Sequence, residues 1–126
     1  MGVAEVLKAK DPKTQVFIIE PSESPSISKG YAGTHDLEGI GVGFVPPLLR
    51  RDLYDEVILV NEDEAKAMAR RLSLEEGVFA GTSTGANVVG AIRAAKMLGK
   101  GKNVVTLAVD SGLKYLSTDL YRRTRS

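Results

Sequence analysis

The residues best suited to chemistry lie in 77–98, where an apolar run, a turn of small residues and a long helical pattern follow one another. The turn runs from Gly81 to Gly85, and a hydroxyl at Ser83 or Thr84 could cap the helix after it. A strand, a turn and a helix N-terminus together form an amide-lined corner of the kind that receives anionic ligands in α/β proteins. The spacing matches neither the dinucleotide-binding motif nor the P-loop. A well-packed corner without a ligand is therefore the alternative interpretation.

Four short apolar runs predict the strands that must position this corner: 16–19, 57–60, 78–80 and 104–109. Helical patterns alternate with them, which predicts an α/β fold with a mainly parallel sheet between layers of helices, a three-layer sandwich. A sheet of about four strands leaves an edge exposed. We therefore expect a partner, a second copy or a missing remainder of the same fold to cover it.

Three helices are predicted from periodicity and capping residues. Residues 2–10 end at Asp11, because a proline disfavours helical geometry in the residue before it. Asn61 begins the second helix, with Glu64 completing a capping box, and Gly77 ends it. The third helix follows the corner, and its small residues would let its backbone lie close to the sheet.

Residues 21–46 form a long stretch rich in serine, proline and glycine. Loops of this length inside compact domains are usually functional or disordered. The segment 39–44 alternates glycine with apolar residues, which argues against simple disorder. The last residues, 122–126, are predicted to form a solvated tail.

The composition excludes several classes of protein. A chain of 126 residues predicts one domain, and its net charge of +1 gives no support for nucleic acid or an anionic membrane as partner. Because there is no cysteine, disulfides and thiolate metal sites are excluded, and the single His35 cannot build a zinc cluster. We expect no metal site. No apolar run is long enough for a membrane span and no signal-peptide pattern is present, so we expect a cytoplasmic protein.

Four motifs occur in a fixed order: EPSESP (20–25), EGIGVGFVP (38–46), EG with GTSTGA (76–77 and 81–86), and DSGLKYLST (110–118). Together they resemble the C-terminal part of the cysteine synthase (O-acetylserine sulfhydrylase) and cystathionine β-synthase family. These are pyridoxal-phosphate enzymes of fold type II, with a tryptophan synthase β-like fold. The resemblance extends from about Gly2 to Tyr121.

The resemblance also implies what this chain does not contain. The family's Schiff-base lysine and its substrate-carboxylate loop lie in an N-terminal segment that has no counterpart here, and the phosphate-binding loop would come just before Met1. No lysine of this chain, including Lys102 and Lys114, occupies the catalytic position. The resemblance therefore implies no catalytic residue in this chain, which is expected to be inactive alone, as a fragment or as one half of a split enzyme.

Two neighbouring residues are candidates for the cofactor's pyridine nitrogen. Ser111 matches the family's serine whose hydroxyl hydrogen-bonds that atom, and Asp110 is the competing candidate. Neighbours that leave a strand point in opposite directions, so one of the two is expected to face the ring. A neutral donor does not lock the ring in its protonated form, which suits β-elimination and replacement.

Two glycines match the family's loop on the substrate side of the cofactor, Gly39 and Gly41. Glycine there would let the backbone approach a flat ring and let the loop move. The family usually has glutamine at the position of Glu38. We expect the corner 81–85 to be mainly scaffold near the ring, and His35 to be a loop residue that makes local hydrogen bonds.

The resemblance implies two classes of function. The first is the C-terminal portion of an enzyme that makes cysteine from an activated serine and sulfide, or one that makes cystathionine. The second is a non-catalytic binding module that pairs with a separate N-terminal chain or with itself, a homodimer being expected.

Overall fold

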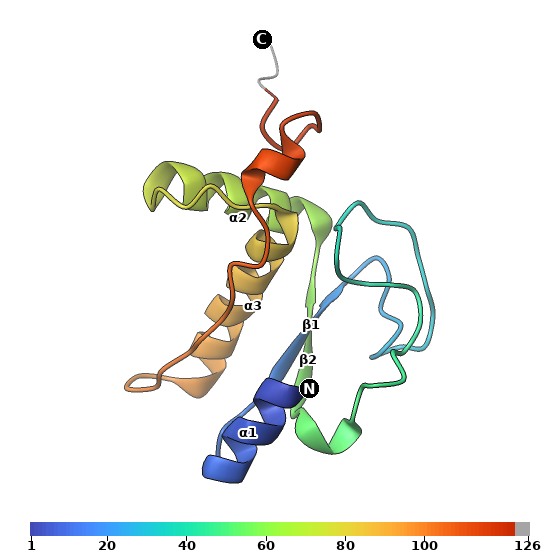
Figure 1. Ribbon diagram of the computed structural model, residues 1–126, viewed down its shortest axis with the longest axis vertical. Coiled ribbons are helices and arrows are strands. Elements are labelled where there is room, and N and C mark those ends of the chain that lie inside the picture. The colour runs from blue at the N-terminus through green and yellow to red at the C-terminus, as the bar shows by residue number, and fades with distance from the viewer. Residues whose placement is uncertain (123–126) are drawn as a thin grey trace.

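The computed structural model describes residues 1–122 of the chain (Figure 1). Its elements, in chain order, are α1 (Gly2–Lys10), β1 (Phe17–Pro21), the 3-10 turn η1 (Arg51–Leu53), β2 (Glu56–Val60), α2 (Glu62–Glu75), α3 (Thr82–Leu98) and the 3-10 turn η2 (Gly112–Tyr115). Of the tail predicted to be solvated, Arg122 is exposed and the residues after it lie outside the described part. No helix in the described part is long and apolar enough to cross a lipid bilayer.

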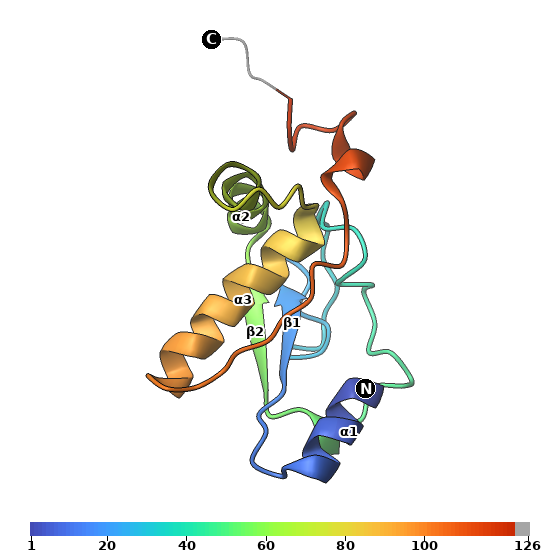
Figure 2. The ribbon, with the colours of Figure 1, turned by 60° about the vertical axis from the view of Figure 1, so that its left-hand side comes forward.

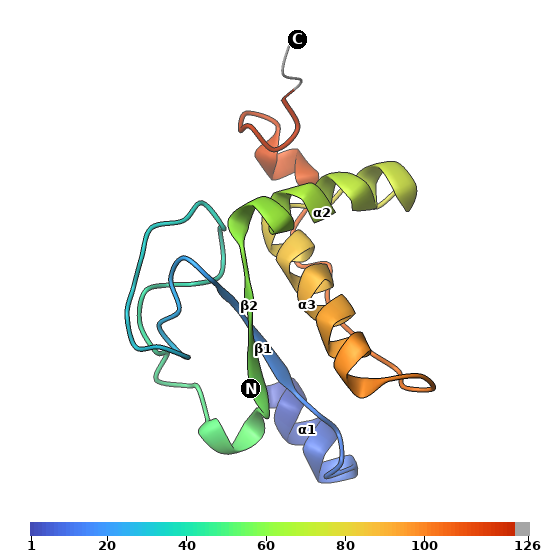
Figure 3. The same cartoon turned by 180° about the vertical axis from the view of Figure 1, so that it is seen from behind.

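The two strands β1 and β2 pair in parallel, with Phe17 opposite Glu56 and Pro21 opposite Val60. The predicted α/β fold with a parallel sheet is confirmed. Helices α2 and α3 lie on one side of the strands and the loop between Ser22 and Arg50 lies on the other (Figures 1 and 3).

The predicted strands 78–80 and 104–109 do not form among the described residues, apart from one antiparallel bridge between Ala80 and Ser111. Instead, the segment after α3 runs back alongside that helix (Figure 2). Its apolar side chains are open to solvent, with Val105 88% exposed. A strand requires backbone hydrogen bonds to a neighbouring strand, and among the described residues this segment forms none with β1 or β2.

The main core lies between the sheet and the two long helices. Its buried members are Leu37, Ile58, Val60, Ala65, Ala86, Val89 and Ala94. The expected close approach of α3 to the sheet occurs at Gly90, where an added Cβ would lie 2.1 Å from Cδ1 of Ile19 in β1. At Gly85 the helix instead approaches α2, because an added Cβ there would lie 2.0 Å from the carbonyl oxygen of Ala65. The core thereby fixes the first turn of α3 against α2.

Helix α2 follows its prediction. Asn61 accepts from the amide of Asp63 and Glu64 reaches back to the amide of Asn61, so the capping box is confirmed. The helix ends at Glu75, and Gly77 adopts a φ of 70° that favours glycine.

The loop after β1 is held by two carboxylates, those of the buried Glu20 and the half-buried Glu23. Glu20, 2% exposed, accepts from the amides of Ile27 (2.6 Å) and Ser28 (3.1 Å) and from the Ser28 hydroxyl (2.8 Å). Glu23 accepts from Asn61 Nδ2 at 2.5 Å and from the amide of Glu62 at 3.0 Å. These bonds tie the loop to the start of α2.

Candidate functional site

The side chain of Asp110 caps the N-terminus of α3. Its carboxylate accepts from the amides of Ser83 (3.1 Å) and Thr84 (3.0 Å), from the Ser83 hydroxyl (2.7 Å) and from the Thr84 hydroxyl. Tyr115 donates its hydroxyl proton to the same carboxylate at 2.9 Å. Burial alone would raise the pKa of Asp110, but these bonds outweigh it and lower the pKa from 3.8 to about 2.

The predicted capping role of Ser83 or Thr84 is wrong. The residue before the helix is Gly81, and the two hydroxyl residues lie inside the first turn. The carboxylate of Asp110 already takes the amides of Ser83 and Thr84, two of those that an external anion would need. The corner is therefore internally capped, which agrees with the alternative interpretation of a packed corner without an anionic ligand.

The carboxylate also fixes the direction of three hydroxyl protons. Ser83, Thr84 and Tyr115 each have one such proton and each donates it to Asp110. The Thr84 oxygen in turn accepts from the amides of Val109 (3.0 Å) and Asp110 (3.2 Å). Its donor and acceptor positions are therefore all used within the chain. Burial and the charge of Asp110 raise the pKa of Tyr115, which keeps its proton.

Ser111 faces away from this network. It is exposed, and its Oγ accepts from the amide of Leu113 at 3.3 Å, which caps η2. Its backbone is fixed by flanking bonds, from the amide of Gly81 to the carbonyl of Asp110 (3.3 Å) and from the amide of Gly112 to the carbonyl of Phe79 (3.0 Å). The structure thus separates the two neighbours: Asp110 faces α3 and Ser111 faces outward.

The two predicted glycines have different surroundings. Gly39 has a φ of 85° and nothing within 4 Å of an added Cβ, so one side of it is open. Gly41 has a φ of 63°, and an added Cβ would lie 2.5 Å from both His35 Nε2 and Pro21 Cγ. Packing therefore requires glycine at position 41, whereas position 39 leaves room for a flat group.

The loop that carries these glycines is connected to η2 by an ion pair between Glu38 and Lys114. The acidic residue at position 38, where the family usually has glutamine, thus has a partner within this chain. His35 makes the local hydrogen bonds expected of it. Its Nδ1 accepts from the amide of Leu37 (3.1 Å), so its Nε2 is the donor to the carbonyl of Gly41 (2.9 Å).

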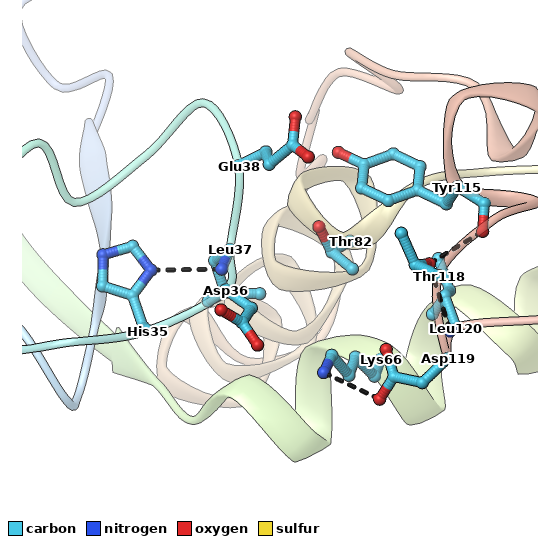
Figure 4. Close-up of a pocket in the computed structure, with 10 residues that line it drawn as sticks. All are labelled: His35, Asp36, Leu37, Glu38, Lys66, Thr82, Tyr115, Thr118, Asp119 and Leu120. Carbon is cyan, nitrogen blue, oxygen red and sulfur yellow. Dashed lines mark hydrogen bonds and ion pairs between the residues drawn. The ribbon is translucent and has the colours of Figure 1, made fainter.

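A pocket of about 370 Å³ lies between this loop, α2, the start of α3 and η2 (Figure 4). Lys66 lies in it, 2.8 Å from Glu62 and 3.1 Å from Asp119, and these carboxylates raise its pKa. Thr82 is 2% exposed, and its hydroxyl faces that of Tyr115 without a well-aligned hydrogen bond. The pocket adjoins the Asp110 network through Tyr115.

Sequence reasoning missed the role of Asp110 as a cap and the contributions of Lys66, Thr82 and Tyr115. One signal was available for Asp110: an acidic residue follows an apolar run directly, at the point where the chain returns to the corner. The i,i+4 spacing predicts the ion pair of Lys66 with Glu62, which the structure contains, but no local pattern identifies Thr82 or Tyr115.

Comparison with known proteins places these residues in context. The family model described as "Pyridoxal-phosphate dependent enzyme" matches residues 1–110. The cysteine synthase of Staphylococcus aureus (strain Mu50) is 48% identical over 120 residues, which cover 95% of this chain and 39% of that protein. A probable cysteine synthase of Bacillus subtilis is 44% identical over the same length. The chain thus spans about two fifths of the length of the curated relatives it matches.

Solved structures of enzymes with related names also resemble this chain. The cysteine synthase of Entamoeba histolytica superimposes with a TM-score of 0.93 at 34% identity, covering 99% of this chain and 37% of that one. An O-acetylserine dependent cystathionine β-synthase from Helicobacter pylori superimposes with a TM-score of 0.89 at 33% identity, covering 96% and 39%.

Proposed function

The chain belongs to the family of pyridoxal-phosphate-dependent enzymes, and on that premise we propose that it supplies the C-terminal part of a cysteine synthase. The complete enzyme would replace the activated hydroxyl of a serine such as O-acetylserine by sulfide. The observation that carries the proposal is the 48% identity to a cysteine synthase over 120 residues. Because those residues cover 39% of that relative, activity is proposed for the whole protein and not for this chain alone.

The residues of this chain suit the ring of the cofactor better than its phosphate. The amides of Ser83 and Thr84 are taken by Asp110, so a phosphate would have to compete with that carboxylate for them. Ser111 presents an exposed hydroxyl beside η2, and Gly39 has an open side. The cofactor supplies the electron sink of the reaction. We propose that Ser111 donates to the ring nitrogen, while both oxygens of Asp110 are already used within the chain.

The N-terminal part of the enzyme is the proposed partner, and its docking surface is apolar. A groove of about 560 Å³ lies between α1, β1, α3 and the extended segment 103–106. Around it Val3, Leu7 and Val105 are 70%, 43% and 88% exposed. The backbone of β1 is paired only on its β2 side among the described residues. The open edge of β1 and the exposed apolar side chains around it favour docking of the remaining part of the same fold.

The test of the proposed function compares this chain with the full-length protein. The purified chain, supplied with pyridoxal phosphate, O-acetylserine and sulfide, should form no cysteine above background. Addition of the separately produced N-terminal part, or use of the full-length protein, should restore cysteine formation. Robust turnover by the chain alone, or no turnover by the full-length protein, would contradict the proposal.

Cystathionine synthesis is the second candidate, because the Helicobacter pylori enzyme superimposes almost as well. The full-length protein should be offered O-acetylserine with either sulfide or homocysteine. A preference for homocysteine would favour this candidate over cysteine synthesis.

A non-catalytic module is the remaining alternative. Light scattering would distinguish a chain that pairs with itself, the expected homodimer, from one that pairs only with the N-terminal part. The cytoplasmic location stays a prediction.

A further inference from the structure

The backbone of the loop 38–45 is held at one point. Among residues 1–122, this backbone makes a single hydrogen bond, in which the carbonyl of Gly41 accepts from His35 Nε2 at 2.9 Å. Gly39 and Gly43 have φ angles of 85° and 81°, and an added Cβ at either would make no contact closer than 3.5 Å. Neither packing nor hydrogen bonding therefore fixes the two glycines on either side of Gly41.

The ring of His35 connects this point to the core. Its Nδ1 accepts from the amide of Leu37 at 3.1 Å, and Leu37 is a core residue that is 2% exposed (Figure 4). On the other side the ring packs directly on Gly41, where an added Cβ would lie 2.5 Å from Nε2. One nitrogen accepts and the other donates, an arrangement that only the neutral imidazole provides.

Protonation of His35 is incompatible with this arrangement. In the charged ring both nitrogens are donors, so Nδ1 would direct a proton at the amide proton of Leu37. That amide would also lose its acceptor, and a buried amide without a partner is unfavourable. The charged ring must therefore turn away from Leu37 and needs a new acceptor.

The start of α2 supplies an acceptor. Glu62 accepts from the amide of Asp36 at 2.8 Å and from Lys66 at 2.8 Å. Burial would raise the pKa of Glu62, but the bonds from Lys66 and the Asp36 amide, together with the nearby charges of Lys66 and a protonated His35, lower it. The Glu62 carboxylate thus lies within electrostatic reach of the His35 ring.

The other charged groups around the ring are mostly acidic. Lys66 divides its one positive charge between Glu62 and Asp119. The remaining carboxylates on the surrounding segments belong to Glu23, Asp36 and Glu38, and of these Glu38 is paired with Lys114. The surroundings are therefore negative overall, which suits a protonated ring.

We propose that His35 is a pH-sensitive link between the core and the loop 38–45: the neutral ring holds Gly41 in place, and the protonated ring turns toward Glu62 and releases it. The ion pair of Glu38 with Lys114 still holds one end of the loop, so the released segment is 39–43. The inference concerns residues of this chain alone, and its test is therefore independent of the proposed function.

The experiment follows the 126-residue chain by nuclear magnetic resonance from pH 8 to pH 5, the range in which histidine changes charge. His35 is the single histidine, so its ring signals are unambiguous. The protection factor of the Leu37 amide against hydrogen exchange, corrected for the intrinsic effect of pH, should fall by about 10-fold. The amide shifts of residues 39–43 should change with the same midpoint as the ring. The amide of the buried Ala69 in α2 is the internal control and should keep its protection.

Three variants separate the link from a general effect of pH. His35→Gln has no group that titrates in this range and should abolish the changes at Leu37 and in the loop. Glu62→Gln removes the carboxylate that attracts the charged ring, so the midpoint should fall by about half a pH unit. Glu64→Gln is its matched control, because Glu64 lies in the same turn of α2 but bonds to Asn61 and Arg93, and it should leave the midpoint in place.

Four outcomes overturn the inference. The ring does not titrate between pH 8 and pH 5, or it titrates while the signals of residues 39–43 stay unchanged. The Leu37 and Ala69 amides lose protection together, which would indicate a loss of global stability. Finally, His35→Gln keeps the pH response of the loop. Should His35→Gln fail to fold, the comparison of Glu62→Gln with Glu64→Gln decides, and equal midpoints in these two variants would contradict the link.

Discussion

Two glycines of α3 allow a direct test of how the first turn of this helix is held against its neighbours. An added methyl group on Gly85 would lie 2.0 Å from the carbonyl oxygen of Ala65, and the other nearby atoms are also backbone atoms of α2. On Gly90 the methyl group would lie 2.1 Å from Cδ1 of Ile19, the end of a side chain that can rotate. The two sites thus share a helix and a type of clash but differ in what must move.

The expected effects follow from these contacts. Either alanine gains about 1 kcal/mol of helix propensity over glycine. In Gly85→Ala the helices must separate by about 1.4 Å to reach ordinary contact at 3.4 Å, and overpacking of this kind costs about 3 kcal/mol. In Gly90→Ala a displaced rotamer of Ile19 costs about 1 kcal/mol. We therefore expect Gly85→Ala to lower the free energy of unfolding by about 2 kcal/mol and Gly90→Ala to leave it nearly unchanged.

Urea unfolding of the purified chain, followed by circular dichroism at one protein concentration, measures this difference. With an m-value of about 1–2 kcal/mol/M, the midpoint of Gly85→Ala should fall by about 1–2 M, while that of Gly90→Ala should stay at the wild-type value. Equal midpoints for the two variants would refute the claim that backbone contact with α2 fixes the start of α3.

Three further predictions concern charged side chains and their partners. Because folding lowers the pKa of Asp110 from 3.8 to about 2, its contribution to stability is present above pH 4 and is lost as the pH falls toward 2. Thermal unfolding across that range should show a shallower loss in Asp110→Asn than in the wild-type chain. Glu20→Ala leaves the amides near Ser28 without their acceptor and should cost about 3 kcal/mol in urea unfolding, with Glu20→Gln costing less. Lys66→Met should cost about 1 kcal/mol by the same assay, whereas Arg71→Met, which breaks an exposed pair, should cost less than about 0.5 kcal/mol.

The parts of the fold that depend on local signals were predictable from the sequence. The β-branched run that ends in Val60 forms a strand, and the polar residues Asn61 and Glu64 begin α2 as expected. Such signals act over a few residues, so one stretch of sequence contains the whole cause. The apolar run 104–109 was not predictable in this way, because a strand also needs a neighbour, which a local pattern cannot supply.

The candidate site likewise combines features that local sequence determines with features that depend on distant residues. Its order of motifs along the chain and the local hydrogen bonds of His35 followed from the sequence. The start of α3 did not, because the nearby hydroxyls of Ser83 and Thr84 satisfy a local capping rule as well as Asp110 does. Asp110 lies 27 residues after Ser83 and 26 residues after Thr84, and its negative charge makes it the stronger acceptor. A rule based on local sequence cannot weigh an acceptor that only folding brings near.

The distant cap of α3 has a consequence for how the chain acquires its structure. During synthesis the whole of α3 leaves the ribosome before Asp110 does. The first turn of the helix therefore lacks its acceptor until the 26 residues that follow Thr84 have also emerged. Until then the open amides and hydroxyls of that turn are free to fray. Closing the intervening loop costs chain entropy, which couples the start of the helix to the arrival of the C-terminal segment. We expect a released chain that ends at Val109 to have a protease-sensitive first turn, and a released chain that extends past Tyr115 to have a protected one.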